Sequence, residues 1–221
     1  MSTPKHTVYC AGPLFNAKER EEMADLASAL ENAGFGTFLP QRDGLELTVC
    51  VKALTKRGMS HKKAAQMVGK AIFALDVYQV VKGCQGIIVN LNGRVPDEGA
   101  VSEAAIAWSA GKAVVGYKAD GRSVFLGEDN PLVAGLFDFN ICATIHETVQ
   151  AVASALASPS APRRIVNTRR KQLRGYLRLG EQIWAAMHHE NKIQKVAEVL
   201  QKESLVPAAS AAGKACLAGA T

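Results

Sequence analysis

The sequence predicts an α/β protein: a flavodoxin-like three-layer sandwich with a five-stranded parallel sheet, followed by a C-terminal helical extension. Two observations carry this prediction. Short apolar runs alternate with helical patterns over the first 157 residues, and the connections between them are short. The apolar run Gly86–Leu91 is also typical of a buried strand in a sheet covered on both faces. With five strands we expect the order 2-1-3-4-5, with a ligand crevice where strands 1 and 3 end.

The individual elements follow from local signals. Asn16 is placed to open the first helix, Gly34 lies just past its end, and Ser60 can cap the second helix. Segment 41–59 mixes Gly44 and Gly58 with an apolar stretch and is interpreted as a partly helical loop. The expected strands are 7–10, 35–39, 86–91, 113–117 and 139–143, and the expected helices are 16–33, 61–82, 98–110 and 146–157, with Gly111 stopping the third.

The charge of the chain is uneven and divides it into two parts. The net charge of +6 resolves into −1 for residues 1–161 and +7 for residues 162–221. We therefore expect a main domain over 1–161, a linker near 158–164, and a basic amphipathic extension over 162–221. Within the extension, one long helix is predicted for 167–203 and disorder for the Ala- and Gly-rich end, 207–221.

The basic extension has two interpretations. Seven Lys and Arg residues and no acid stand between positions 163 and 178, which is a pattern that nucleic acid could attract. A solvated helix face whose apolar stripe docks on a subunit explains the same pattern without a further partner. We favour the second interpretation, so a nucleic-acid partner is not expected.

Other features exclude whole classes of function. The N-terminus lacks the basic and apolar segments of a signal peptide, and no apolar run reaches the length of a membrane span. The five cysteines and five histidines show no metal-ligand spacing. We therefore expect a cytoplasmic protein with reduced thiols, no metal, no cofactor and no membrane partner.

Several acids are predicted to meet at the crevice. Glu103 follows the third strand by one loop, in the early turns of a helix made mostly of alanine. Asp97 precedes that helix, where it could equally be an N-cap. Asp76 stands in the apolar stripe of the second helix, where an acid is either a structural acceptor or faces a pocket. Tyr9, at the end of the first strand, adds a phenol.

Glycosyl transfer suits this set of groups. A carboxylate can attack an anomeric carbon while a second carboxyl group handles the proton of the leaving group. No Ser or Cys beside a His, no GxGxxG turn and no Walker loop is evident.

The chain resembles the nucleoside 2-deoxyribosyltransferase family over about residues 6–150. The resemblance is carried by an ordered set of motifs: Tyr9-Cys10-Ala11-Gly12-Pro13-Leu14-Phe15, Asp76 in its helix, Asp97-x-Gly99-x-x-x-Glu103, Gly116-Tyr117-x-x-Asp120-x-Arg122, and Asp129-Asn130-Pro131. It implies an enzyme that exchanges the base of free 2′-deoxynucleosides, with nucleobases as the second substrate, and a homo-oligomer with shared active sites.

The resemblance also implies roles for single residues. Glu103 would be the nucleophile, Tyr9 would position it, and Asp76 would be the general acid and base. Asp97 and, from a neighbouring subunit, Asn130 would bind the 5′-hydroxyl group of the sugar. The remaining candidates for substrate binding are Phe15, Gly12, Gln41, Arg42 and Asp43. Glu103 lies near a helix N-terminus, which favours its ionised form. Asp76 lies in an apolar setting, which favours its protonated form.

Two alternatives stay open. The first is an N-glycoside hydrolase of the same fold that acts on nucleosides or on nucleoside 5′-monophosphates. Asp97 and Glu98 would repel a phosphate group, which favours free nucleosides. The second alternative is a non-catalytic module that binds nucleotides or nucleic acid through the crevice and the basic extension.

Overall fold

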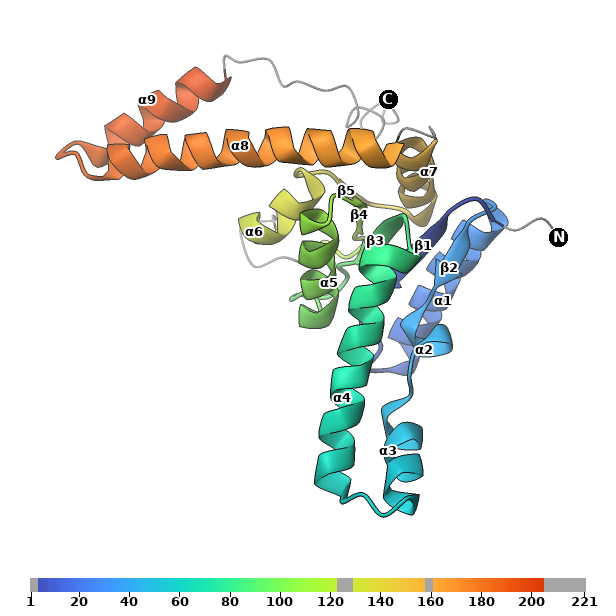
Figure 1. The fold of residues 1–221 in the computed structure, drawn as a ribbon. Helices are drawn as coiled ribbons and strands as arrows, with labels where there is room; N and C mark the ends of the chain where they lie inside the picture. Colours follow the sequence, from blue (N-terminus) through green and yellow to red (C-terminus); the bar gives the residue numbers. More distant parts are fainter. Residues whose placement is uncertain (1–3, 123–128, 158–160, 205–221) are drawn as a thin grey trace. The chain divides into compact units, whose positions relative to one another are not determined.

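The structure is a computed structural model that describes residues 4–122, 129–157 and 161–204. The chain divides into two compact units, residues 1–162 and residues 163–221 (Figure 1). Each is described below by itself. None of the helices in the described part of the chain combines the length and apolarity that a bilayer crossing requires.

The first unit is built on a five-stranded, wholly parallel sheet with the order β2-β1-β3-β4-β5. The strands are β1 (Thr7–Ala11), β2 (Gly36–Phe38), β3 (Gly86–Asn90), β4 (Ala113–Tyr117) and β5 (Ile141–Cys142). The predicted fold class and strand order are therefore confirmed. In this order the chain reverses its direction of winding between β1 and β3, which makes their carboxyl ends the switch point of the sheet.

Helices cover both faces of the sheet, which gives three layers (Figure 1). The bounds are α1 (Ala17–Asn32), α2 (Pro40–Asp43), α3 (Leu47–Lys56), α4 (His61–Tyr78), η1 (Gln79–Gly83), α5 (Glu98–Ser109), α6 (Pro131–Ala134), η2 (Gly135–Phe137) and α7 (Ile145–Leu156). Alternate residues of β1 serve the two faces: Val8 and Cys10 on one, Tyr9 and Ala11 on the other. Tyr9 and Ala11 belong to a core cluster with three alanines of α5, Ala100, Ala104 and Ala107.

The residues predicted to start and to end the first helix have these roles in the structure of α1. The Asn16 side chain accepts a hydrogen bond from the backbone N–H of Glu19, and the Glu19 side chain returns to the backbone of Asn16, so the two form a capping box. Gly34 has a φ of 87°, and Gly111, beyond α5, has a φ of 69°. Both glycines end their helices in the left-handed conformation that glycine adopts at low cost.

Helices α3 and α4 form an antiparallel hairpin that extends away from the sheet (Figure 1). We call residues 45–78 the arm. The arm has a small core of its own, with Val51, Ala64 and Val68 buried. Segment 41–59, interpreted from the sequence as a partly helical loop, thus contains α2 and the first helix of the arm.

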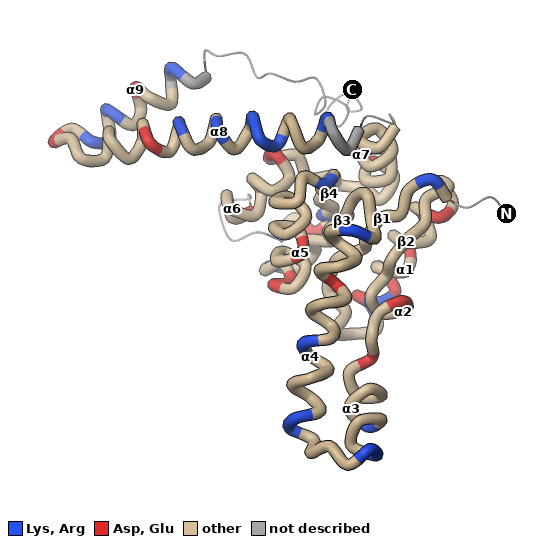
Figure 2. Tube along the Cα trace, in the orientation of Figure 1, with Lys and Arg blue, Asp and Glu red and all other residues tan. Residues whose placement is uncertain are grey.

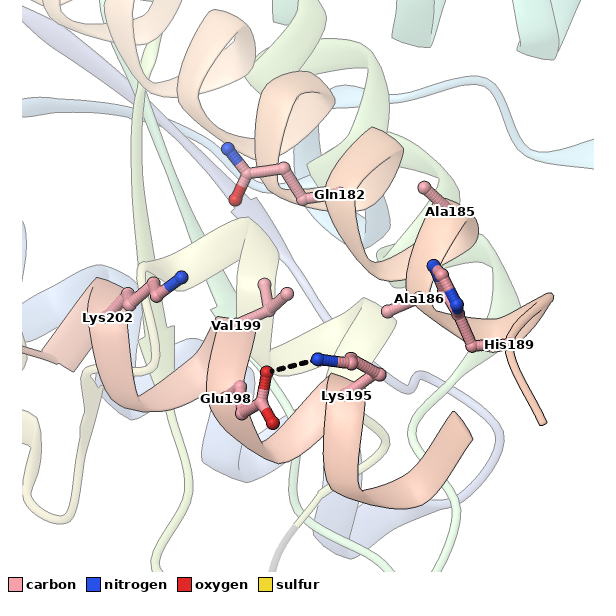
Figure 3. Close-up of a pocket in the computed structure, with 8 residues that line it drawn as sticks. All are labelled: Gln182, Ala185, Ala186, His189, Lys195, Glu198, Val199 and Lys202. Carbon is pink, nitrogen blue, oxygen red and sulfur yellow. Dashed lines mark hydrogen bonds and ion pairs between the residues drawn. The ribbon is translucent and has the colours of Figure 1, made fainter. Parts of the chain in front are cut away.

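In its described part, the second unit contains α8 (Ala161–Met187), which begins just before the division, and α9 (Lys192–Ser204). A pocket lies between the two helices, and an ion pair between Lys195 and Glu198, 2.9 Å long, stands at its edge (Figure 3). None of the predicted site residues lines this pocket. Its lining residues are Gln182, Ala185, Ala186, His189, Lys195, Glu198, Val199 and Lys202.

The prediction of one helix over 167–203 is wrong, because the chain leaves the helix between His188 and Asn191. The Nδ1 atom of His188 lies 2.8 Å from the Trp184 carbonyl oxygen, which a continuing helix would pair with the backbone N–H of His188. That N–H donates to Ala185 instead, so the ring competes with the backbone and the last turn tightens.

Three further predictions concern the same region. The linker prediction is wrong for positions 161–164, which form the first turn of α8, whereas 158–160 lie outside the described residues. The predicted disorder at 207–221 also falls outside them. The expected division of labour between residues 1–161 and 162–221 remains a prediction.

Candidate active site

A hydrogen bond between Tyr9 and Glu103 is the centre of the candidate site. The Tyr9 hydroxyl group, on β1, donates to Oε1 of Glu103, on α5, over 2.6 Å. The Tyr9 side chain is fully buried, and its ring stacks on Phe38 with centroids 5.3 Å apart. A phenol held in this way has one orientation, so it fixes the carboxylate that it touches.

Asp76 brings a second carboxylate to the same hydroxyl group. It lies near the end of α4, and it interacts with the Tyr9 hydroxyl and with the charge of Glu103. The strand order predicted that Tyr9, Asp97 and Glu103 meet at one crevice, and it left Asp76 as a further candidate. In the structure the Tyr9 hydroxyl group is hydrogen-bonded to Glu103, and Asp76 lies near enough to influence the pKa of both groups.

Burial controls the ionisation of this cluster. Loss of water raises the pKa of Glu103 to about 7, against the hydrogen bond from Tyr9, which lowers it, and with help from the charges of Asp76 and Asp97. Burial likewise raises the pKa of Asp76, opposed by the hydrogen bond with Tyr9. The pKa of Tyr9 is raised by burial and by the two neighbouring carboxylates, so its hydroxyl group keeps its proton and remains a donor.

These shifts refine the expectation that Glu103 is ionised at neutral pH. The helix N-terminus was expected to dominate, whereas burial is the largest influence and raises the pKa of Glu103 to about 7. The expected protonation of Asp76 agrees with the direction of its shift.

Asp97 has the capping role that the sequence allowed. Its Oδ2 atom accepts a hydrogen bond from the backbone N–H of Ala100, 2.7 Å away, at the start of α5. Its Oδ1 atom has no hydrogen-bond partner within the described residues, so the capping bond leaves one carboxylate oxygen for a ligand. Capping and ligand binding are therefore compatible at Asp97.

Gly12 lies where backbone and core approach each other closely. A Cβ atom at this position would stand 2.9 Å from the Cβ atom of Asn90 and in contact with the sulfur atom of Met23. Only glycine fits without a shift of these neighbours, so Gly12 shapes the turn that follows β1.

A polar network beside Gly12 was missed by the sequence analysis. Asn90, at the end of β3, is fully buried and donates from Nδ2 to Glu22 over 3.1 Å. Its Oδ1 atom accepts from the backbone of Asn92, and the Asn92 side chain accepts from the backbone N–H groups of Ala119 and Asp120. The network thus ties the loop after β3 to the loop after β4. The available signal was an amide at the end of an otherwise apolar run.

Three of the weaker candidates have partners of their own. Arg42 forms ion pairs with Glu31 and Asp43, each 2.9 Å long, and Asp43 also accepts from the backbone N–H of Leu39. The Gln41 side chain donates to the Arg20 carbonyl group over 2.9 Å. A role of these side chains in reading a base stays a prediction.

Phe15 and Asn130 lie at the surface. Phe15 is 76% exposed in the turn after β1. Asn130 caps α6, with its Oδ1 atom accepting from the backbone N–H of Leu132 over 3.0 Å. Within the described residues no group of three or more His, Cys, Asp and Glu side chains is arranged to hold a metal ion.

Fold and site together define a class, namely parallel α/β proteins with clustered carboxylates at the switch point of the sheet. The chain belongs to the nucleoside 2-deoxyribosyltransferase family, because the model of that family matches residues 8–172, well over half of the chain. The resemblance noted in the sequence is thereby confirmed, and activity of the nucleoside 2-deoxyribosyltransferase type follows from the family.

Solved structures of low sequence identity are also similar. A conserved protein from Enterococcus faecalis V583 is 20% identical, with a TM-score of 0.49, over 66% of this chain and 95% of the other. A 2-deoxyribosyltransferase from Bacillus psychrosaccharolyticus is 17% identical, with a TM-score of 0.42, over 59% and 82%. The enzyme from Leishmania mexicana is 16% identical, with a TM-score of 0.45, over 66% and 95%. At the level of whole sequences, no curated protein matches this chain.

Proposed function

We propose that this protein transfers the 2-deoxyribosyl group between nucleobases of free 2′-deoxynucleosides, through a covalent intermediate on Glu103. The observation that carries the proposal is the hydrogen bond of 2.6 Å from Tyr9 to Glu103, beside the carboxyl group of Asp76, in a chain of this family.

In the first half-reaction, the ionised Glu103 carboxylate attacks the anomeric carbon and the bond from that carbon to the base breaks. Tyr9 holds the attacking carboxylate in place through its hydrogen bond. Asp76, whose pKa is raised by burial, keeps a proton that it can give to the departing base.

In the second half-reaction, a new base displaces Glu103 and gives its proton to Asp76. Two inversions at the anomeric carbon leave its configuration unchanged, and the kinetics are ping-pong. Both enzyme groups return to their starting protonation states. The reaction would recycle free bases, which is the chemistry of nucleoside salvage. The buried free thiols of Cys10 and Cys84 suit a reducing compartment such as the cytoplasm.

The sugar would be held at its 5′ end. Asp97 can accept a hydrogen bond from the 5′-hydroxyl group with its Oδ1 atom. Asp97 and Glu98 are adjacent acids at the start of α5, and a 5′-phosphate group would be repelled there. We therefore propose free nucleosides as substrates. Asn130 of the partner subunit would complete this end of the site, which makes a homo-oligomer the active form.

A product assay tests the proposal. The protein is incubated with deoxyinosine or thymidine and free adenine, and deoxyadenosine is sought by chromatography, with Glu103→Ala in parallel. New deoxyadenosine that the variant fails to produce supports transfer through Glu103. Free base and deoxyribose without exchange would establish the hydrolase instead, and absence of turnover would favour a binding module.

A further inference from the structure

The arm has the opposite charge from the rest of the first unit. Residues 45–78 contain six Lys and Arg residues and two acids, a net charge of +4. The remainder of residues 1–161, which we call the body, contains nine Lys and Arg residues and fourteen acids, a net charge of −5. The net charge of −1 for residues 1–161 is therefore the sum of two regions of opposite charge.

Figure 2 shows the cations of the arm spread from the middle of α4 to the tip of the hairpin. All six are exposed, and none forms an ion pair within the part of the chain that the structure describes. They are Lys52, Lys56, Arg57, Lys62, Lys63 and Lys70.

The arm also carries more apolar surface than its small core can bury. Phe73 is 67% exposed, Val49 63% and Tyr78 58%. Leu45, Leu47 and Met67 are exposed as well. Large apolar side chains left exposed on one projecting hairpin indicate an interaction site.

Charge and apolar surface together select the partner. A polyanion that offers charge alone, such as the backbone of a nucleic-acid duplex, would neutralise the lysines and leave the aromatic and aliphatic side chains in water. The body of another copy offers the complementary charge, and it is densest on α1, which has five acids and two cations. Such a contact occurs twice in a two-fold pair, because each arm meets the body of the other copy.

We propose that the arm, residues 45–78, is a docking surface for the acidic body of a second copy of this protein. This inference goes beyond the shared site proposed above, which concerns Asn130 and assigns no role to the arm. Docking of the arm is measured by the mass of the assembly and by cross-linking, whereas the proposed chemistry is measured by the product assay. Failure of one can therefore be distinguished from failure of the other.

Light scattering on the purified full-length chain is the first test. At micromolar concentration and about 0.15 M salt, we expect twice the chain mass of 23.5 kDa, or a higher even multiple. Lys62→Glu with Lys63→Glu and Lys70→Glu should raise the dissociation constant roughly tenfold or more, and so should Met67→Ser with Phe73→Ser. The matched control is Val95→Ser with Lys5→Glu, an exposed apolar residue and an exposed cation outside both the arm and the C-terminal extension.

Cross-linking of a mixture of light and ¹⁵N-labelled chains gives the contact directly. A zero-length carbodiimide reagent should join Lys62, Lys63 or Lys70 of one chain to acids of α1, such as Glu21 or Asp25, of a differently labelled chain. Circular dichroism and thermal melting show that each variant is folded. The proposal is overturned by a monomeric wild type, by assembly that both arm variants leave intact, by cross-links confined to single chains, or by arm-dependent binding to nucleic acid without self-association.

Discussion

Replacing Glu103 by glutamine should stabilise the protein, in a way that depends on pH. Burial raises the pKa of Glu103 from 4.5 to about 7 in the folded chain. At 1.36 kcal/mol for each unit of pKa, keeping the charged carboxylate in this site costs about 3 kcal/mol of folding free energy. The amide of glutamine carries no charge, and its oxygen can still accept the hydrogen bond from Tyr9.

The direction in which stability changes with pH follows from the protons bound by the folded and unfolded chains. Between pH 4.5 and 7 the folded wild type retains a proton on Glu103 that the unfolded chain has lost, so its stability falls as the pH rises. Glu103→Gln removes this dependence. The free energy of unfolding of the variant should exceed that of the wild type most at pH 8, by up to about 3 kcal/mol, and the excess should shrink by pH 5.

Urea unfolding of both proteins at pH 5, 6, 7 and 8 measures the effect. Glu98→Gln is the control, because Glu98 lies exposed on the first turn of the same helix. A difference between Glu103→Gln and wild type that stays constant with pH, or grows toward acid, would refute the reasoning. The variant should also be inactive, so that stability and activity change in opposite directions.

Three other substitutions have defined outcomes. Tyr9→Phe removes the donor to Glu103 and should move the acid limb of the pH–rate profile up by about one to two units; an unshifted limb would contradict this. Gly12→Ala should cost about 1 to 3 kcal/mol in urea unfolding, because its Cβ atom would meet Met23 and Asn90. Gly69→Ala should raise the free energy of unfolding by about 1 kcal/mol, since nothing lies within 4 Å of the new Cβ atom inside α4. A lower melting temperature of this variant would contradict the prediction.

Features of the fold were predictable from the sequence where a local pattern and a topological rule agreed. The alternation of strands and helices predicted the strand order, and the strand order brought Tyr9 and Glu103 together although they lie far apart in the sequence. The capping signal at Asn16 was sufficient because a capping box is a local interaction.

Features were not predictable where tertiary packing, or competition between a side chain and the backbone for a hydrogen bond, determines the local structure. Helix α3 lies between Gly44 and Gly58, which made its segment ambiguous in the sequence, and its packing against α4 holds it in place. The buried amide of Asn90 was hidden in an apolar run, because its partner Glu22 comes from another element. The break at His188 depends on the position of a ring nitrogen atom, which a hydrophobic pattern cannot indicate.

The pairing of β1 with β3 has a consequence for the order of folding. Val8 pairs with Gly86, and the whole arm lies in the chain between them. Contacts between distant segments form slowly, because a long loop must close first. The arm can form earlier, since α3 and α4 are neighbours in sequence, and this shortens the effective loop. During synthesis β1 must therefore wait for its central partner, and Tyr9 meets Glu103 only after more than 100 residues have left the ribosome. The hydrogen bond between Tyr9 and Glu103 is thus a late reporter of native structure.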